Sequence, residues 1–315
     1  MHVFISELGQ GPPEITVTGE EAQGWCEPWT APAIQASTRA HLASIGALSG
    51  DLESANVVLV DLVDHLAQGS RRALSDLRSQ TQAIGAQLVV RLHSAWRGGS
   101  TDDLDGEGPD LDCVWDAADA VLVASRHHLV RLASFGGIDA ARTRIAPVAF
   151  DGLGPTAEAP SEGCGRTRLL VAGETHRKAM EPVLEMLADS DPKKATYQVI
   201  YGLQQFQEKI AGARALLVPA VASFGDRSLV DAALSAGAVA VLSPFAGAVD
   251  GPLPRGVEVV ADMHTSAGWR AALERALTLE PSARVPLLAD ACERQVEILR
   301  SIWVEGSNCA ARPAA

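Results

Sequence analysis

The alternation of short, continuous apolar runs with helix-like patterns is the feature that most constrains this chain. The strands of a parallel sheet are covered on both faces, so they read as unbroken runs of Val, Leu and Ile. The clearest runs are Asn56–Asp61, Gln87–His93, Ala120–Ser125, Arg168–Ala172, Ala215–Pro219 and Ala238–Leu242, with shorter ones at Val3–Ser6, Arg144–Val148, Tyr197–Tyr201 and Val257–Val260. This pattern predicts the α/β class, with largely parallel sheets.

Helical patterns separate these runs. They cover Ser70–Ile84, the segment from Ser125 through Phe135, Glu181–Asp189, Leu229–Ala236, Ala267–Leu277 and a long final stretch, Val285–Val304. A strand that is followed by a helix and then by a parallel strand is the βαβ unit, whose connection is right-handed. The chain is therefore predicted to be a series of such units.

The length of 315 residues favours two domains. Residues 151–165 are rich in Gly, Pro, Ala and Glu, as inter-domain linkers often are. We predict a Rossmann-like domain at 1–155, a second at 156–285, and a C-terminal helix with a tail at 286–315. The two domains are expected to face each other across a cleft.

Charge and cysteine usage exclude several function classes. The net charge is −13 and no Lys/Arg run is present, which disfavours duplex nucleic acid and a polybasic membrane anchor. Five cysteines, without a Cys-x-x-Cys, argue against a disulfide framework or a structural zinc site. The apolar runs are too short to span a bilayer and the first residues do not resemble a signal peptide, so a cytoplasmic protein is expected.

Ligands of open α/β sheets bind beyond the carboxyl ends of the strands, so the loops at those ends are the candidate binding loops. After Arg168–Ala172 come Gly173 and then Arg177 and Lys178, before a helix that is predicted to have Pro182 in its first turn. The free N–H groups of that helix and its basic residues suit an anion. A solvated basic loop is the alternative.

A second loop follows the strand that ends at Pro219. Gly225 would allow a close approach of the backbone to a ligand, and the Arg227 fork suits phosphate. Asp226 or Ser228 would cap the next helix. The alternative is a capped turn with a surface arginine. Gly202, after another strand, could receive a nucleobase edge or simply form a turn.

In the first half, His93 ends a buried strand, where it is expected to face the cleft and to bind a hydroxyl or shuttle a proton. A structural histidine is the alternative. Gly9 and Gly11 form a Gly-x-Gly without a third glycine, which is weak for a dinucleotide site. Trp25 and Trp29 could stack on an acceptor sugar or could simply pack within their loop.

From Asn56 to about Glu305, the chain resembles family-4-like (group 1) glycosyltransferases of the GT-B group. Arg142–Asp151 is similar to the family's R-I-x-V-I-P-N-G-V-D stretch, and Val171–Ala179 resembles V-G-R-x-x-x-K-G. Val218–Gly237 is similar to L-P-S-x-x-E-G-F-G-x-x-x-x-E-A-x-A-x-G. The last helix resembles the one that crosses back to the first domain in this family.

The resemblance implies transfer of a hexose from a nucleotide-sugar donor to an unidentified acceptor, with retention and without a metal or other cofactor. The first domain would bind the acceptor and the second the donor. His93 would face the transferred sugar. The implied donor residues are Gly173, Arg177, Lys178, Ser223, Phe224, Gly225, Arg227 and Asp231, with Gly202 at the base and Gly9, Gly11, Trp25 and Trp29 on the acceptor side.

The sequence also departs from the family's motifs. Glu174 stands where the family has an arginine, Ala222 replaces the first glutamate of the paired motif, and Asp231 is one residue out of step with the second. These changes motivate an alternative, a catalytically inactive GT-B-like protein that binds or scaffolds. A nicotinamide dehydrogenase is a third reading, against which the missing Gly-x-Gly-x-x-Gly argues.

Overall fold

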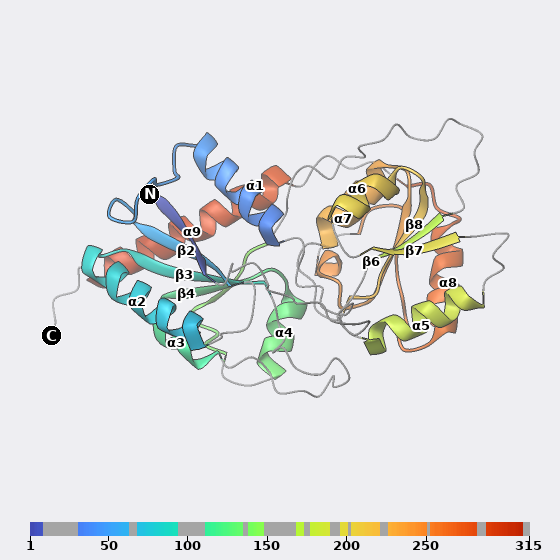
Figure 1. Cartoon of the computed structure of the whole chain (residues 1–315), viewed down its shortest axis with the longest axis horizontal. Coiled ribbons are helices and arrows are strands. Elements are labelled where there is room, and N and C mark those ends of the chain that lie inside the picture. Colours follow the sequence, from blue (N-terminus) through green and yellow to red (C-terminus); the bar gives the residue numbers. More distant parts are fainter. Residues whose placement is uncertain are drawn as a thin grey trace.

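The structure of the chain, a computed structural model, contains two α/β domains that lie side by side (Figure 1). It describes residues 1–8, 31–62, 68–93, 111–134, 138–147, 168–172, 177–189, 196–200, 203–220, 226–250, 253–281 and 288–310. Each domain is built on a five-stranded sheet in which all paired strands are parallel. The predicted fold class is confirmed.

The first sheet has the strand order β1-β2-β3-β4-β5. Its strands are β1 (Val3–Leu8), β2 (Val57–Leu62), β3 (Gln87–Leu92), β4 (Ala120–Val123) and β5 (Thr143–Ile145). The helices of this part of the chain are α1 (Ala31–Ser44), α2 (Gln68–Ile84), α3 (Asp112–Ala117) and α4 (Arg126–Ser134). Gly85, in the left-handed region at φ 71°, ends α2 and lets the chain turn directly into β3.

Both faces of the first sheet are covered, which explains why its strands read as unbroken apolar runs. Side chains alternate between the faces along each strand. In β2, Val58 and Val60 pack with residues of α2, α3 and α4, whereas Val57 and Leu59 pack with α1 and with the last helix, α9 (Leu288–Ala310). The final helix of the chain therefore lies against the first domain (Figure 1).

The second sheet has the order β10-β9-β8-β6-β7. Its strands are β6 (Arg168–Ala172), β7 (Thr196–Ile200), β8 (Ala213–Val218), β9 (Val239–Leu242) and β10 (Val257–Val259). From β6 the chain first moves outward to β7 and then returns to the other side at β8. The topological switch point, where such sheets bind ligands, thus lies between β6 and β8.

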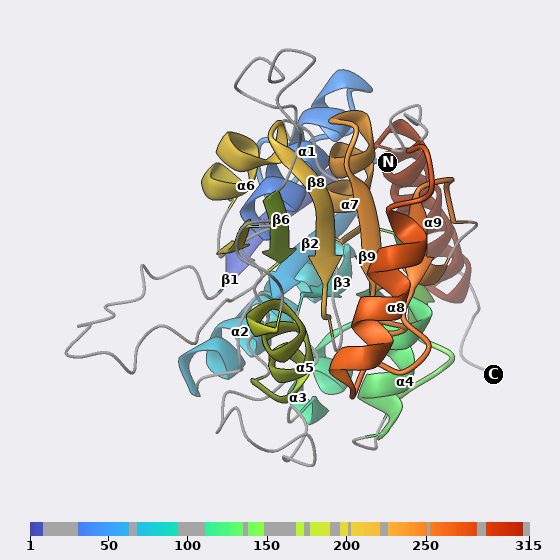
Figure 2. The ribbon, with the colours of Figure 1, turned by 90° about the vertical axis from the view of Figure 1, so that its right-hand side faces the viewer.

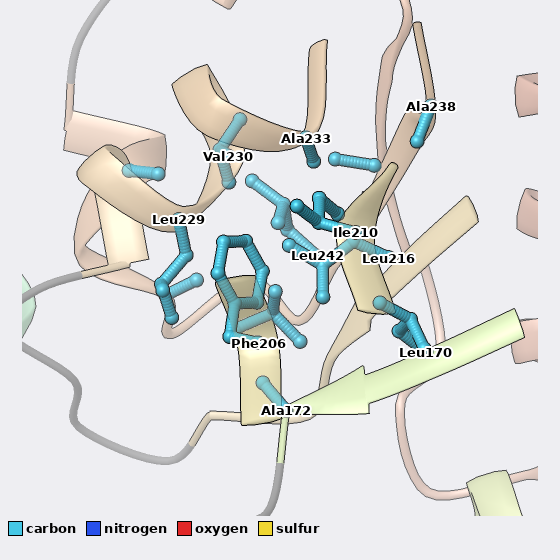
Figure 3. Close-up of a cluster of buried hydrophobic side chains, with 14 of the residues drawn as sticks. Leu170, Ala172, Phe206, Ile210, Leu216, Leu229, Val230, Ala233, Ala238 and Leu242 are labelled. Atoms are coloured by element: carbon cyan, nitrogen blue, oxygen red, sulfur yellow. The ribbon is translucent and has the colours of Figure 1, made fainter. Parts of the chain in front are cut away.

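Helices cover both faces of the second sheet (Figure 2). One face packs against α6 (Leu203–Ile210) and α7 (Asp226–Ser235), with the Phe206 ring beside Leu229 and Val230 (Figure 3). The other face packs against α5 (Arg177–Ala188) and α8 (Ser266–Ala276), where Trp269 is fully buried. Two separate apolar layers thus hold this domain together.

The two domains meet at the carboxyl edges of their sheets. Arg126 follows β4, and its backbone N–H donates to the carboxylate of Asp250, which lies in the short 3-10 helix η2 (Gly247–Asp250) after β9. The neighbouring His127 ring pairs with the same carboxylate at 2.9 Å. Ile34, at the start of α1, is buried in the apolar cluster of the second domain. The loops that follow the strands of both sheets therefore begin at facing edges.

The structure corrects one helix of the sequence analysis. Helix α5 begins at Arg177, four residues before the predicted start, so Pro182 lies inside the helix and not in its first turn. Because Pro182 has no N–H, the carbonyl of Lys178 loses its i→i+4 donor. Helices α1, α3 and α6 were not predicted. Within the described part of the chain, no helix is both long and apolar enough to cross a membrane.

Candidate functional site

Two opposite charges interrupt the apolar runs of neighbouring strands in the first sheet. Asp61 is the fifth residue of β2 and Arg91 the fifth residue of β3, and the parallel register places them directly side by side. They continue the alternation of Leu59 and Val89 and so lie on the face that α1 and α9 cover. Both side chains are about 1% exposed. A buried charge in such a strand is tolerated only when it is paired.

The Arg91 guanidinium is held on three sides. Its Nε and Nη2 donate to the two carboxylate oxygens of Asp61 at 2.5 and 3.0 Å, a bidentate pair. Its Nη1 donates to Thr38 Oγ1 of α1 and to Gln295 Oε1 of α9, both at 3.0 Å. The Nε2 of Gln295 in turn donates to the Pro147 carbonyl at 2.8 Å. The ion pair is therefore fixed by two helices as well as by the sheet.

His93 completes this group at the carboxyl end of β3. Its backbone N–H continues the ladder to the Leu62 carbonyl, and its Nε2 lies 2.7 Å from Asp61 Oδ1. The ring is buried, with 1% of its surface exposed, and among the described residues its Nδ1 has no hydrogen-bond partner. The ring therefore lies against Asp61 through Nε2. The expected role of His93, to bind a hydroxyl or shuttle a proton at the cleft, stays a prediction.

Burial and charge together set the protonation of the two residues. Burial alone would raise the pKa of Asp61, but the Arg91 charge and the hydrogen bond from His93 outweigh it and hold that pKa well below the usual range. Burial lowers the pKa of His93, and Arg91 adds to this, although the hydrogen bond and charge of Asp61 oppose both. The pair is thus an ionised carboxylate and a neutral imidazole.

The structure brings the starts of the two predicted donor helices to neighbouring strands. Helix α5 follows β6 and helix α7 follows β8, the strands that flank the switch point. The first turn of α5 contains Arg177 and Lys178, whose side chains are not among the described parts of the chain. Gly173, Ser223, Phe224, Gly225 and Gly202 lie outside the described residues, as do Glu174 and Ala222.

Arg227 and Asp231 are the two predicted donor residues whose side chains the structure describes. Both are half-buried and lie one turn apart in α7, so they share a face of that helix. Helix α7 begins at Asp226, so Asp226 is its first residue and Ser228 lies inside it, and neither stands at the predicted cap position before the helix. The predicted acceptor residues, Gly9, Gly11, Trp25 and Trp29, lie outside the described residues.

Sequence analysis did not identify Asp61, Arg91, Thr38 or Gln295 as parts of the site. A signal existed for the first two, because opposite charges at matching positions of two consecutive apolar runs lie side by side when those runs form neighbouring parallel strands, as β2 and β3 do. No comparable signal marks Thr38 or Gln295, since the register of a helix on a sheet cannot be read from the sequence. No group of three His, Cys, Asp or Glu side chains suited to a metal ion occurs among the described residues.

Comparison with known proteins identifies the fold. No protein-family model matches the sequence, and no curated protein matches it. Among solved structures, the chain is similar to Anabaena Alr3699/HepE in complex with UDP and glucose, with 12% identity, a TM-score of 0.52, and coverage of 98% of this chain and 99% of that one. The complex of the same protein with UDP-glucose gives 12% identity, a TM-score of 0.51, and coverage of 97% and 99%.

Sucrose-phosphate synthase from Thermosynechococcus elongatus shows 18% identity over 96% of this chain and 81% of its own, with a TM-score of 0.49. The likeness in fold is carried by the Anabaena structures, whose TM-scores exceed 0.5 and which are covered almost completely. The chain has the two-domain GT-B fold of glycosyltransferases, as its resemblance to that group implied.

Proposed function

We propose that this chain is a glycosyltransferase that moves a hexose from a nucleotide-sugar donor to an acceptor, without a metal ion and with retention of the anomeric configuration. The observation that carries the proposal is the buried Asp61–His93 pair at the carboxyl edge of the first sheet, in which His93 Nδ1 has no hydrogen-bond partner among the described residues. A buried acceptor without a hydrogen-bond donor destabilises the folded protein by about 1–3 kcal/mol, so the presence of such an acceptor points to a ligand that supplies the donor. A sugar or acceptor hydroxyl would supply the missing donor.

The second domain supports the donor half of the proposal. Two helices start beside its switch point, and the N–H groups of a helix N-terminus attract anions. Lys178 lies in the first turn of α5 and Arg227 in the first turn of α7, so each helix start also carries a positive charge. A diphosphate that leaves with two negative charges needs this kind of stabilisation.

The facing edges of the two sheets support a transfer between the domains. The contact between Arg126 and Asp250 joins a residue that follows β4 to one that follows β9. His93 and the starts of α5 and α7 follow strands at these same edges. The solved structures with the same fold were determined with UDP, UDP and glucose, or UDP-glucose, so UDP is the first nucleotide to test.

Calorimetric titration with UDP, GDP and ADP tests the donor site. One of them should bind, and Lys178→Met and Arg227→Met should each weaken that nucleotide about tenfold or more, since a charge-assisted hydrogen bond contributes about 1.5–3 kcal/mol. Arg214→Met is the matched control, because Arg214 is exposed near the amino end of β8, at the other edge of the sheet. Absence of binding by all three nucleotides would remove the basis of the proposal.

Transfer itself is tested with the hexose donors of whichever nucleotide binds. His93→Gln should leave nucleotide affinity unchanged and lower transfer about 100-fold or more, in the range of a positioned proton-transfer group. Addition of EDTA should not change the rate, and NMR of the product should show the anomeric configuration of the donor. Nucleotide binding without transfer from any donor would instead support the inactive binding or scaffolding protein.

A further inference from the structure

The Arg91 guanidinium uses four hydrogen bonds in a place that excludes water. Two go to Asp61, one to Thr38 and one to Gln295, and each of these partners is at least 96% buried. A buried guanidinium has five N–H donors, so those not used on Asp61 also need acceptors, and Thr38 and Gln295 supply them from two helices. The arrangement fixes the orientation of the guanidinium plane and, through it, the position of both Asp61 oxygens.

The position of the Asp61 carboxylate determines which nitrogen of His93 carries the proton. Asp61 Oδ1 accepts from Arg91 Nε at 2.5 Å and lies 2.7 Å from His93 Nε2. An ionised carboxylate can only accept, so Nε2 must be the donor. A neutral imidazole has a single N–H, and the lone pair is therefore on Nδ1. A protonated ring would add a second cation beside Arg91 in a buried place, which is unfavourable.

We propose that Arg91 is a positioning residue: its guanidinium holds Asp61 so that His93 keeps its proton on Nε2 and presents Nδ1 as the acceptor for a substrate hydroxyl. This inference rests on the proposed function for the identity of the hydroxyl. Thr38 and Gln295 hold Arg91 in turn. Because Gln295 belongs to α9 and also binds the Pro147 carbonyl, the last helix of the chain takes part in positioning His93.

Among the residues that the structure describes, four charged or polar side chains face His93 and its partners. Asp61 comes from β2 and Arg91 from β3; Thr38 of α1 and Gln295 of α9 add neutral groups. Of these described groups, the charged ones that act on the protonation of His93 are the carboxylate of Asp61 and the guanidinium of Arg91. Loss of the guanidinium leaves a buried carboxylate whose charge favours the imidazolium form.

NMR of the 15N-histidine-labelled full chain, without any ligand, reads this state directly. The His93 signals are assigned by their loss in His93→Gln. At pH 7 the unaltered protein should show a neutral ring that is protonated at Nε2 and bare at Nδ1, and it should stay neutral below pH 6.5, where a free histidine titrates. A proton on Nδ1, or an imidazolium at pH 7, overturns the proposal without the need for any variant.

Substitution of Arg91 then separates charge from packing. In Arg91→Met, the midpoint of the His93 titration should rise by about 1–3 pH units, whereas Arg91→Lys should keep the ring neutral at pH 7, because it retains the cation. Arg78→Met is the matched control: Arg78 pairs with Asp119 at the amino end of the same strand, and the His93 titration should not move. An unchanged titration in a folded Arg91→Met overturns the proposal.

Kinetics add a second readout that a purely structural role would not move. In Arg91→Met, kcat should fall about tenfold between pH 8 and pH 6 while KM for the donor stays constant, because a protonated ring can no longer accept a hydroxyl. If the protein binds no nucleotide at all, the proposed function fails, but the NMR result still stands. If transfer proceeds but the protonation of His93 seen by NMR does not change on substitution of Arg91, the positioning role of Arg91 fails and the proposed function stands.

Discussion

The described part of the chain contains two Asp–His pairs of nearly equal length, and their surroundings differ in burial and in the other partners of the carboxylate. The Asp61–His93 pair, at 2.7 Å, lies inside the first domain with both side chains about 1% exposed. The Asp250–His127 pair, at 2.9 Å, joins the two domains, with side chains that are 18% and 32% exposed. The buried pair shares its carboxylate with Arg91, and the interface pair shares its carboxylate with the backbone N–H of Arg126.

The difference shows that surroundings, and not the pair itself, decide what an Asp–His contact does. Away from water, the carboxylate of Asp61 needs a guanidinium to stay charged, and the His93 ring beside it is neutral, with one unprotonated nitrogen. Near water, Asp250 caps the first turn of α4 while its His127 partner packs edge-on against the Phe245 ring. The first arrangement suits chemistry and the second suits docking of one domain on the other.

The largest expected effect comes from breaking the buried pair. Asp61→Asn would place an amide against the Arg91 donors and leave the guanidinium uncompensated, so the free energy of unfolding should fall by about 3–5 kcal/mol. Urea denaturation at pH 7, followed by circular dichroism, measures this loss. Asp250→Asn is the matched substitution at the exposed pair and should cost about 1 kcal/mol or less. Equal losses of unfolding free energy in Asp61→Asn and Asp250→Asn would contradict the conclusion that burial distinguishes the two pairs.

The buried pair should also make the protein sensitive to acid. The pKa of His93 is lowered in the folded protein, so below pH 6.5 the unfolded chain binds a proton that the folded one does not. The free energy of unfolding therefore decreases as the pH is lowered, by up to about 1.4 kcal/mol per pH unit. Asp61 has a lowered pKa, so its contribution is present above pH 4 and is lost below it.

Denaturation series from pH 8 to pH 5 separate the two residues, since only His93 acts in that range. His93→Gln should remove up to about 2 kcal/mol of the pH-dependent loss, whereas His127→Gln provides the reference for the exposed pair. If the free energy of unfolding depends on pH equally in the unaltered protein and in His93→Gln, the buried ring would titrate like a free histidine, against this prediction.

A smaller effect is expected from removal of the cap between the domains. In Asp250→Ala, the N-terminal turn of α4 loses the carboxylate that accepts from the Arg126 N–H, which should cost about 1 kcal/mol. Differential scanning calorimetry would measure the loss, and small-angle scattering would show whether the domains separate. Asp262→Ala, near the start of α8, is a control that leaves the interface intact. A radius of gyration that is unchanged in Asp250→Ala would limit this pair to helix capping.

The smallest effect is expected at the other end of β3. Arg78 pairs with Asp119 at 2.6 Å, but both side chains are about a quarter exposed, so Arg78→Met should cost about 1 kcal/mol or less. Thermal unfolding at low and at high salt would measure it, because salt screens exposed pairs more strongly than buried ones. A loss close to that of Asp61→Asn would show that burial does not separate the two ends of the strand.

The strands could be predicted from the sequence because each buried apolar run in a parallel sheet is continuous. Helix α1 was missed for a physical reason: its buried face includes Gln35 and Thr38, so apolar residues do not recur at helical spacing. Helix α3 spans 6 residues and α6 spans 8, too few for a period of 3.6 residues to be recognised.

For the site, the sequence pointed to His93 through its place at a strand end but not to its surroundings. Asp61 could have been paired with Arg91 from their matching positions in consecutive strands. Gln295 could not, since it is more than 200 residues away from Arg91 along the chain, and only the packing of α9 on the sheet brings them together. The roles assigned to Lys178 and Arg227 stay predictions.

The return of α9 to the first sheet has a consequence for biosynthesis. When the ribosome has made the first domain, Thr38, Asp61 and Arg91 can already meet, but Gln295 has not yet been translated. Until α9 docks, the apolar stripe formed by Val3, Val57 and Val89 lacks its cover from Val296, Leu299 and Ile302. The nascent first domain should therefore be a client for chaperones, and it would mature only after the second domain has been synthesised.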